Sequence, residues 1–144
     1  MLVVAAFKIR SGTWQELAID AKAIRESVFI QEQYITPEDE WDELDAVSIH
    51  FVVYEHDQAI ATARLLANHS IGRVAVLKTH RGLKIGKQLM QAVIDYAKHE
   101  QRPFLKLSSQ VHAIGFYQAL GFKQQGESYL DCGIPHMDMY MALQ

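Results

Sequence analysis

Three basic side chains and two glycines lie within seven residues, in the stretch RGLKIGK from Arg81 to Lys87. A strand-like run, RVAVL (73–77), precedes this stretch, and an amphipathic helical pattern follows it. The first N–H groups of a helix have no partner within the helix, and the helix dipole adds partial positive charge there. Glycines let such a backbone approach an anion closely. Read alone, the stretch is either a phosphate-binding loop or a basic surface turn with solvated charges, and the rest of the chain must decide between them.

The ATP-binding pattern G-x-x-x-x-G-K-S/T is one phosphate loop to compare with this stretch. Gly82, Gly86 and Lys87 follow its outline, but the loop is one residue shorter. Gln88 also stands where the pattern has the hydroxyl that holds Mg²⁺. These departures argue against an ATP site.

Histidine and cysteine chemistry is less strongly indicated. The seven histidines show no spacing typical of metal ligands, so no metal site is predicted. His50, within the apolar run SIHFVV, is expected to be a hydrogen-bonded core residue. The single cysteine, Cys132, excludes an intrachain disulfide and is expected to be a packed thiol, not a nucleophile.

Alternating secondary structure must position the loop. Residues 2–9 are rich in β-forming types and predict a strand. Helical spacing from Trp14 to Val28 predicts a helix, with Thr13 as N-cap and Glu16 completing a capping box. Pro37 is expected to end any helix. The six acidic residues between Glu38 and Asp45 predict a solvated loop, or alternatively a surface that attracts a cationic acceptor.

Further strands are predicted at 47–54, 59–66, 73–77, 104–109, 128–134 and 136–143, with helices after the basic loop and at 111–122. The order is therefore β-α-β-β-β-α-β-α-β-β. The unit at 73–108 is a βαβ crossover, which makes its two strands parallel, while the hairpins are antiparallel. Met137, Met139 and Met141 alternate along the last strand and predict a core face.

Composition limits the class of protein. The chain has 144 residues, 49% hydrophobic and 22% charged, which suits one soluble domain over residues 1–144. The net charge of −3 argues against nucleic-acid binding. The absence of a signal peptide and of a run of about 20 apolar residues predicts no membrane association and a cytoplasmic location.

Two motifs together resemble those of the GNAT N-acetyltransferases. The segment from Arg81 to Gly86 resembles the family's pyrophosphate loop, Q/R-x-x-G-x-G/A, except that Lys84 replaces the usual glycine. HAIGFYQALGF (112–122) resembles the family's second signature, A-x-x-F-Y-x-x-L-G-F. The resemblance extends over the whole chain. It implies an α+β fold with a central, mostly antiparallel mixed sheet, one parallel βαβ unit and helices on both faces.

Three further segments resemble the ElaA-like subgroup of that family. Its R-x-x-V-F-x-x-E-Q, D-x-x-D-x-x-x-x-H and G-I-P-H patterns correspond here to segments that begin at Arg25, Asp42 and Gly133. This finer resemblance does not name an acceptor.

The resemblance implies roles for individual residues. The thioester and its pantetheine arm would lie along the strand residues Val74, Ala75 and Val76. The pyrophosphate would be held by the loop residues Arg81, Gly82, Leu83, Lys84, Ile85, Gly86 and Lys87. Lys84 is expected to be near-helical, with its side chain toward solvent or the cosubstrate.

Tyr117, from the F-Y pair, would donate a proton to the departing thiolate. Phe116 beside it is expected to be the core residue of the pair. Glu32 and His136 are candidates for the base that deprotonates the amine, unless the amine arrives neutral.

The implied activity is direct transfer of an acetyl group from acetyl-CoA, as cosubstrate and without a metal, to a primary amine of a small molecule or peptide. The alternative is a non-catalytic acyl-CoA-binding or sensing domain on the same fold. Many members of the family dimerise, which leaves a homodimer open for this chain.

Overall fold

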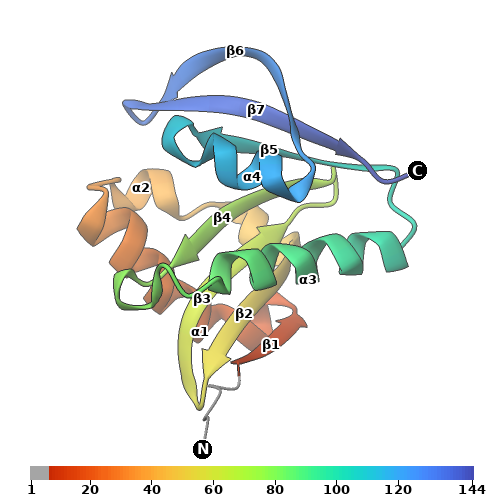
Figure 1. The fold of residues 1–144 in the computed structure, drawn as a ribbon. Coiled ribbons are helices and arrows are strands. Elements are labelled where there is room, and N and C mark those ends of the chain that lie inside the picture. The colour runs from red at the N-terminus through yellow and green to blue at the C-terminus, as the bar shows by residue number, and fades with distance from the viewer. Residues whose placement is uncertain (1–6) are drawn as a thin grey trace, which may run out of the picture.

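The computed structural model describes residues 7–144. A seven-stranded sheet with the order β1-β2-β3-β4-β5-β7-β6 forms its centre. Every neighbouring pair is antiparallel except β4 and β5. Figure 1 shows α1 on one face of this sheet and α3 on the other. The predicted α+β fold class, with one parallel strand pair, is confirmed.

The elements follow the predicted order. The strands are β1 (Phe7–Gly12), β2 (Ile49–Glu55), β3 (Gln58–Leu65), β4 (Ser70–Val76), β5 (Phe104–Gln110), β6 (Lys123–Asp131) and β7 (Ile134–Ala142). The α-helices are α1 (Trp14–Arg25), α2 (Pro37–Glu40), α3 (Ile85–His99) and α4 (Ile114–Leu120). Short 3₁₀ turns η2 (Glu43–Val47), η3 (Lys78–His80) and η4 (Val111–Ala113) connect them. No helix among these is long and apolar enough to cross a membrane.

The two faces of β2 show why helices cover both sides of the sheet. Successive side chains of a strand point to opposite faces. Phe51 and Val53 accordingly join the core under α3, whereas Val52 and Tyr54 join the core under α1. Met139 is fully buried on the α3 side, and its neighbours at 137 and 141 pack against the same core, as the alternation predicted.

The first helix differs from expectation at its end. Its capping box at Thr13 and Glu16 is present as predicted. The helix then continues as a π-helix, η1 (Glu26–Glu32), whose wider turn leaves both Val28 and Phe29 buried. Pro37 begins a helix instead of only ending one, because the first helical position does not need its N–H group.

Several strand boundaries also differ. The strands β4, β6 and β7 begin at Ser70, Lys123 and Ile134, before their predicted starts at 73, 128 and 136. The predicted first strand, 2–9, lies partly outside the described residues, and β1 extends beyond its predicted end. The predicted strand 128–134 is wrong at its end because Cys132 and Gly133 form the β6–β7 turn. Their φ angles of 51° and 76° suit the two-residue turn that joins twisted antiparallel strands.

The parallel pair β4–β5 is short, and a cavity lies where its two strands separate. The strands pair only at Ser70 with Lys106 and at Ile71 with Leu107, and then separate. The β3–β4 register shifts at the same level, since Thr62 pairs with Ala75 and Arg64 with Gly72. Two residues of β4 therefore oppose one of β3, which is a β-bulge.

Candidate active site

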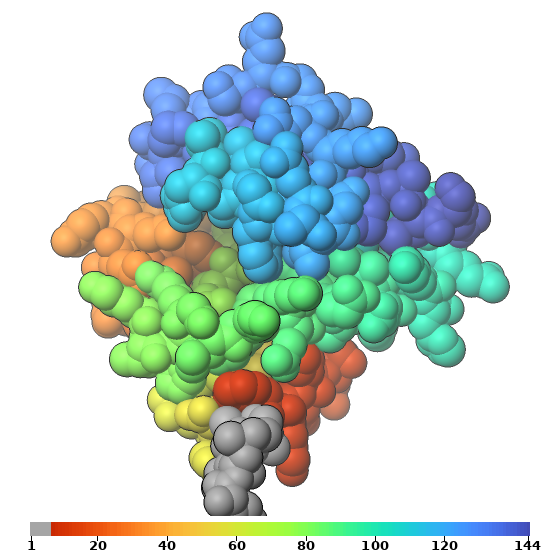
Figure 2. Space-filling view, viewed as in Figure 1, coloured from red at the N-terminus to blue at the C-terminus, as the bar shows by residue number. Residues whose placement is uncertain are grey.

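The separated strands β4 and β5 enclose a cavity of about 1020 Å³. Besides the two strands, its walls come from five parts of the chain: the π-helix, α2, the loop before α3, α4 from Phe116 onward, and the β6–β7 hairpin. In Figure 2 the surface recedes between the green loop, the orange π-helix region and the cyan α4. All thirteen predicted site residues except Leu83 line this one cavity. Leu83 is exposed beside it.

The N-terminus of α3 forms one end of the cavity. The first helical hydrogen bond runs from the Gln88 N–H to the Lys84 carbonyl (3.2 Å), so the N–H groups of residues 85–87 have no helical partner. Lys84 is the N-cap and has φ 64° and ψ 19°. It is therefore left-handed, not near-helical as predicted, because the chain must reverse here to enter the helix. Such a conformation costs a non-glycine residue about 1–2 kcal/mol.

Basic side chains surround this helix end. Lys84 and Lys87 are exposed and form no ion pair with any described residue. Gly86 leaves room for Phe116, whose Cζ atom would lie 3.4 Å from a Cβ atom at that position. The backbone and the two lysines are therefore placed to receive an anionic group.

Arg81 lies at the same end, but its side chain turns back toward the sheet. Its guanidinium donates to both carboxylate oxygens of Glu32, at 2.6 and 2.8 Å, and its Nε–H donates to the Val76 carbonyl at 3.0 Å. These hydrogen bonds hold the pKa of Glu32 below its ordinary value. Glu32 is thus an ionised partner of Arg81, and a weaker base than a free carboxylate.

Backbone groups of β4 face the gap. The Leu77 N–H donates to the Ile60 carbonyl (2.9 Å), and Val76 lies opposite Ala61. In an antiparallel ladder this makes Val76 a non-hydrogen-bonded position, so its N–H and C=O point away from β3. The Arg81 contact occupies the carbonyl, and the Val76 N–H is directed into the gap between β4 and β5.

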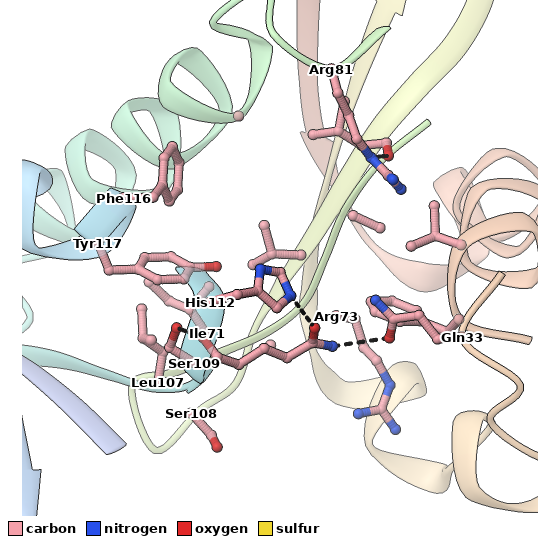
Figure 3. A pocket seen from close by; sticks show the side chains of 18 of the residues that line it. Gln33, Ile71, Arg73, Arg81, Leu107, Ser108, Ser109, His112, Phe116 and Tyr117 are labelled. Atoms are coloured by element: carbon pink, nitrogen blue, oxygen red, sulfur yellow. Dashed lines mark hydrogen bonds between the residues drawn. The ribbon is translucent and has the colours of Figure 1, made fainter. Parts of the chain in front are cut away.

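Tyr117 points into the cavity from α4 (Figure 3). Its side chain is only 8% exposed, and the rings of Phe116 and Phe122 pack against it edge-on. Burial raises the pKa of Tyr117 to about 12. Phe116 was predicted to be the core member of the pair, which is wrong, since it is 38% exposed. The spacing of Ala113, Tyr117 and Leu120, which share the core face, is the signal that identifies the buried ring.

A chain of hydrogen bonds that the sequence did not reveal crosses the cavity (Figure 3). The Gln110 amide nitrogen donates to the Gln33 oxygen (2.9 Å), and the Gln110 oxygen accepts from His112 Nε2 (2.7 Å). This bridge connects the end of the π-helix to the end of β5. Gln33 follows Glu32 in the R-x-x-V-F-x-x-E-Q segment that begins at Arg25, and this position in the pattern is what marked Gln33 in the sequence.

His136 lines the cavity from β7, where it pairs with Gln110. Its Nδ1 donates to the Ile134 carbonyl (2.7 Å), which leaves Nε2 as the basic nitrogen. Cys132 at the hairpin turn is exposed, not packed as predicted. Partial desolvation by neighbouring atoms and the carboxylates of Asp131 and Asp39 raise the pKa of its thiol, so it is a poor nucleophile.

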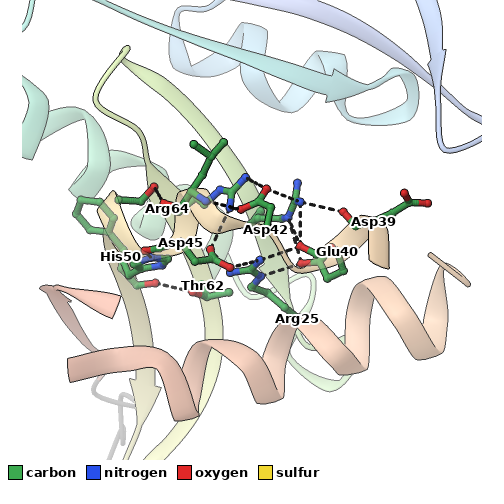
Figure 4. Close-up of polar contacts among 12 residues, drawn as sticks. Arg25, Asp39, Glu40, Asp42, Asp45, His50, Thr62 and Arg64 are labelled. Carbon is green, nitrogen blue, oxygen red and sulfur yellow. Dashed lines mark hydrogen bonds and ion pairs between the residues drawn. The ribbon is translucent and has the colours of Figure 1, made fainter. Parts of the chain in front are cut away.

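The acidic segment 38–45 is not the solvated loop that was predicted. Glu40 and Asp45 are buried, and Arg25 binds both, at 2.8 and 2.7 Å (Figure 4). Arg64 binds Asp42 and Asp45. The arginines at 25, 64 and 73 thus match the carboxylates at 40, 42 and 45, and the network is neutral.

His50 is buried, as predicted, and its Nε2 lies 2.9 Å from the Asp45 carbonyl. Burial lowers its pKa, so it remains neutral. Among residues 7–144, no group of three or more histidine, cysteine, aspartate or glutamate side chains is arranged to hold a metal ion.

A family profile described as "Acetyltransferase (GNAT) domain" matches residues 17–143. The chain belongs to the GNAT acetyltransferase family. It is 34% identical to the protein ElaA of Escherichia coli over 125 residues, 81% of each chain. It is 35% identical to a Bacillus subtilis protein named uncharacterized N-acetyltransferase YjcF, over 87% of this chain and 92% of that one.

Solved structures of GNAT proteins match the fold described above. The crystal structure of Escherichia coli ElaA superposes with a TM-score of 0.85 and 29% identity, over 94% of this chain and 99% of that one. An acyl-CoA N-acyltransferase from Pseudomonas aeruginosa gives a TM-score of 0.86 and 29% identity, over 95% and 100%. The GNAT family uses acyl-CoA, and the chain is accordingly an acyltransferase.

Proposed function

We propose that the protein is an acetyl-CoA-dependent N-acetyltransferase that moves the acetyl group directly to a primary amine of a small molecule or peptide. The observation that carries this proposal is the Tyr117 hydroxyl. It points into the same cavity as the β4 edge and the N-terminus of α3, and it has no hydrogen-bond partner within residues 7–144. The ring is buried, but the hydroxyl oxygen is accessible from the cavity, so this donor is available to a substrate.

The α3 end suits a pyrophosphate. The N–H groups of residues 85–87 and the side chains of Lys84 and Lys87 together provide donors and positive charge. Arg81 was expected to help hold the pyrophosphate, but its side chain has a different role. Glu32 neutralises its charge, and its contact with the Val76 carbonyl braces the loop against β4.

The β4 edge suits the reacting thioester. When the amine nitrogen attacks the carbonyl carbon, negative charge develops on the carbonyl oxygen. The Val76 N–H, directed into the gap, is the donor that would stabilise this oxygen. The intermediate then collapses, the carbon–sulfur bond breaks, and the thiolate leaves.

Tyr117 then assists the thiolate by hydrogen bonding more than by giving up its proton. Its pKa of about 12 keeps the phenol protonated at neutral pH. A thiol of pKa near 8.5 is the stronger acid, so full transfer from Tyr117 is unfavourable by roughly 5 kcal/mol. In this mechanism the proton that the thiolate finally receives comes from the attacking amine.

Of the two candidate bases, His136 is the better placed for proton removal. The Glu32 carboxylate accepts hydrogen bonds from Nη1 and Nη2 of Arg81. His136 Nε2, in contrast, forms no hydrogen bond with any described residue. An acceptor amine that binds in its neutral form would need neither Glu32 nor His136 as a base.

The decisive experiment measures thiol release from acetyl-CoA with a panel of polyamines, amino sugars, amino acids and peptides. We expect acceptor-dependent release with at least one class, and stabilisation against heat by acetyl-CoA and CoA but not by Mg-ATP. Stabilisation by acetyl-CoA without transfer to any amine would favour the non-catalytic alternative. Stabilisation by Mg-ATP alone would contradict both.

A further inference from the structure

Arg73 has a backbone conformation that a strand residue normally avoids. Seven non-glycine residues within 7–144 have positive φ, and six of them lie in turns, loops or helix ends. Arg73, with φ 52°, lies inside β4. A glycine would adopt this angle without steric cost. The arginine at this position therefore indicates that its side chain does something glycine cannot do.

The conformation of Arg73 sets the course of β4. Arg73 and Val74 together oppose Ala63 on β3, and this bulge begins two residues after Ile71, the last residue paired with β5. An extra residue in one strand bends it and increases its twist. The bulge thus turns β4 away from β5 and determines which backbone groups of Val74 to Val76 face the cavity.

The Arg73 side chain holds the opposite wall of the cavity. Its Nη2 donates to the carbonyls of Glu40 (2.9 Å) and Asp39 (3.3 Å), and its Nε lies 3.2 Å from the Glu40 carboxylate. These carbonyls end the short helix α2, where they have no helical partner. Arg25 holds the same glutamate from α1, with contacts to its carboxylate (2.8 Å) and carbonyl (3.2 Å).

The Arg73 side chain therefore connects two walls of the cavity, α2 and the β4 edge. Arg73 fixes α2, and with it Asp39 at the cavity rim, relative to the β4 edge that carries the Val76 N–H. The α3 end, where the lysines lie, has no contact with this guanidinium. A change at Arg73 should disturb the reacting groups more than the phosphate end.

We propose that Arg73 is a positioning residue for acyl transfer, which holds the β4 bulge and the α2 wall in the relative placement that the reaction needs. This inference rests on the proposed function, because the acyl group must lie along β4. Arg73 does not contact the reacting atoms in this account. It acts through the Val74–Val76 backbone.

The test compares Arg73→Gly and Arg73→Lys with a matched control, Arg102→Gly. Glycine retains the left-handed angle but removes the contacts of the Arg73 side chain with Asp39 and Glu40, which we call the clamp. Lysine retains the positive charge but lacks the several N–H donors of the guanidinium. Arg102 also binds a backbone carbonyl and a carboxylate, of Leu66 and Glu100, but does not line the cavity. For each folded variant, kcat, the Kd for acetyl-CoA and the amide NMR shifts of Val74, Ala75 and Val76 are measured.

We expect kcat of Arg73→Gly to fall about 10- to 100-fold, as small misplacements of reacting groups do. Arg73→Lys should lie between this variant and wild type. The Kd for acetyl-CoA should stay within about two-fold, because the α3 end is separate from the clamp. The three amide signals should move in Arg73→Gly and stay in place in Arg102→Gly, which should also keep wild-type kcat.

An unchanged kcat in Arg73→Gly would overturn the proposal, and so would a Kd that weakens as much as kcat falls. If wild type transfers acetyl to no amine, the proposed function fails first. The amide signals then decide alone, since unmoved signals at residues 74–76 would show that the clamp does not set the β4 edge.

Discussion

Tyr117 and Tyr54 are equally buried tyrosines, each 8% exposed and each with a pKa raised to about 12. Burial is the main cause in both, but the Tyr54 hydroxyl donates to Asp20, whereas the Tyr117 hydroxyl faces the cavity. Removing each hydroxyl in turn therefore shows whether loss of activity comes from losing any buried phenol or from losing the one that faces the cavity.

We predict that Tyr117→Phe lowers kcat by about 10- to 100-fold, the worth of one hydrogen bond to a charged group. The Kd for acetyl-CoA should be nearly unchanged, because the α3 end is intact. Tyr54→Phe is the control and should keep wild-type kcat. Steady-state kinetics and calorimetry measure both. Wild-type turnover in Tyr117→Phe would remove this hydroxyl from the mechanism.

Glu32 provides a second prediction at the residue scale. Because Arg81 lowers its pKa, Glu32 is ionised throughout the range from about pH 5 to 9 and cannot produce an inflection there. We expect Glu32→Gln to keep any acidic limb of the kcat/KM profile at its wild-type pH. His136→Gln, which removes the proposed base, should lower kcat/KM. Loss of the limb in Glu32→Gln instead would assign the base to Glu32.

At the scale of elements, the start of α3 shows how a loop keeps its shape without the usual glycine. We predict that Lys84→Gly stabilises the protein by about 1 kcal/mol, because glycine removes the left-handed cost. Lys87→Gly, in the first turn of α3, should destabilise it by about 0.5–1 kcal/mol. Urea unfolding measures both. Destabilisation by Lys84→Gly would mean that the lysine side chain stabilises the loop through contacts of its own.

The order of strands and helices followed from patterns within single segments, and so did the capping box at Thr13 and the methionine face of β7. Local irregularities did not, because they depend on what packs nearby. The apolar run 73–77 gives no sign that the chain bulges at Arg73. The short α4 has only two turns, so its neighbouring aromatics could be assigned to the core only through the spacing from Ala113 to Leu120.

At the scale of the whole molecule, the contacts that shape the cavity join residues far apart in sequence. Glu32 and Arg81 are 49 positions apart, and Gln33 and Gln110 are 77 apart. The sequence singled out both Glu32 and Arg81 but assigned them separate tasks. Only the sheet order, which places the π-helix beside the loop before α3, reveals that they bind each other.

The buried ion network is the largest such connection, since it joins α1, α2, η2, β3 and β4. We predict that Arg25→Met destabilises the protein by about 3–5 kcal/mol at pH 7, because it leaves buried carboxylates without their partner. Lys98→Met, an exposed position on α3, is the control and should stay within about 0.5 kcal/mol of wild type.

The pH dependence of that loss is the sharper test. Burial already raises the pKa of Glu40, and Arg25 is one of the groups that oppose this rise, so its removal raises the pKa further. A carboxyl whose pKa is higher in the folded state binds protons preferentially there, so the folded state gains stability as pH falls. The deficit of Arg25→Met should therefore shrink between pH 8 and about pH 5, as urea unfolding at several pH values would measure. A deficit that stays constant over this range would mean that lost packing of the arginine, not an unpaired buried charge, destabilises the variant.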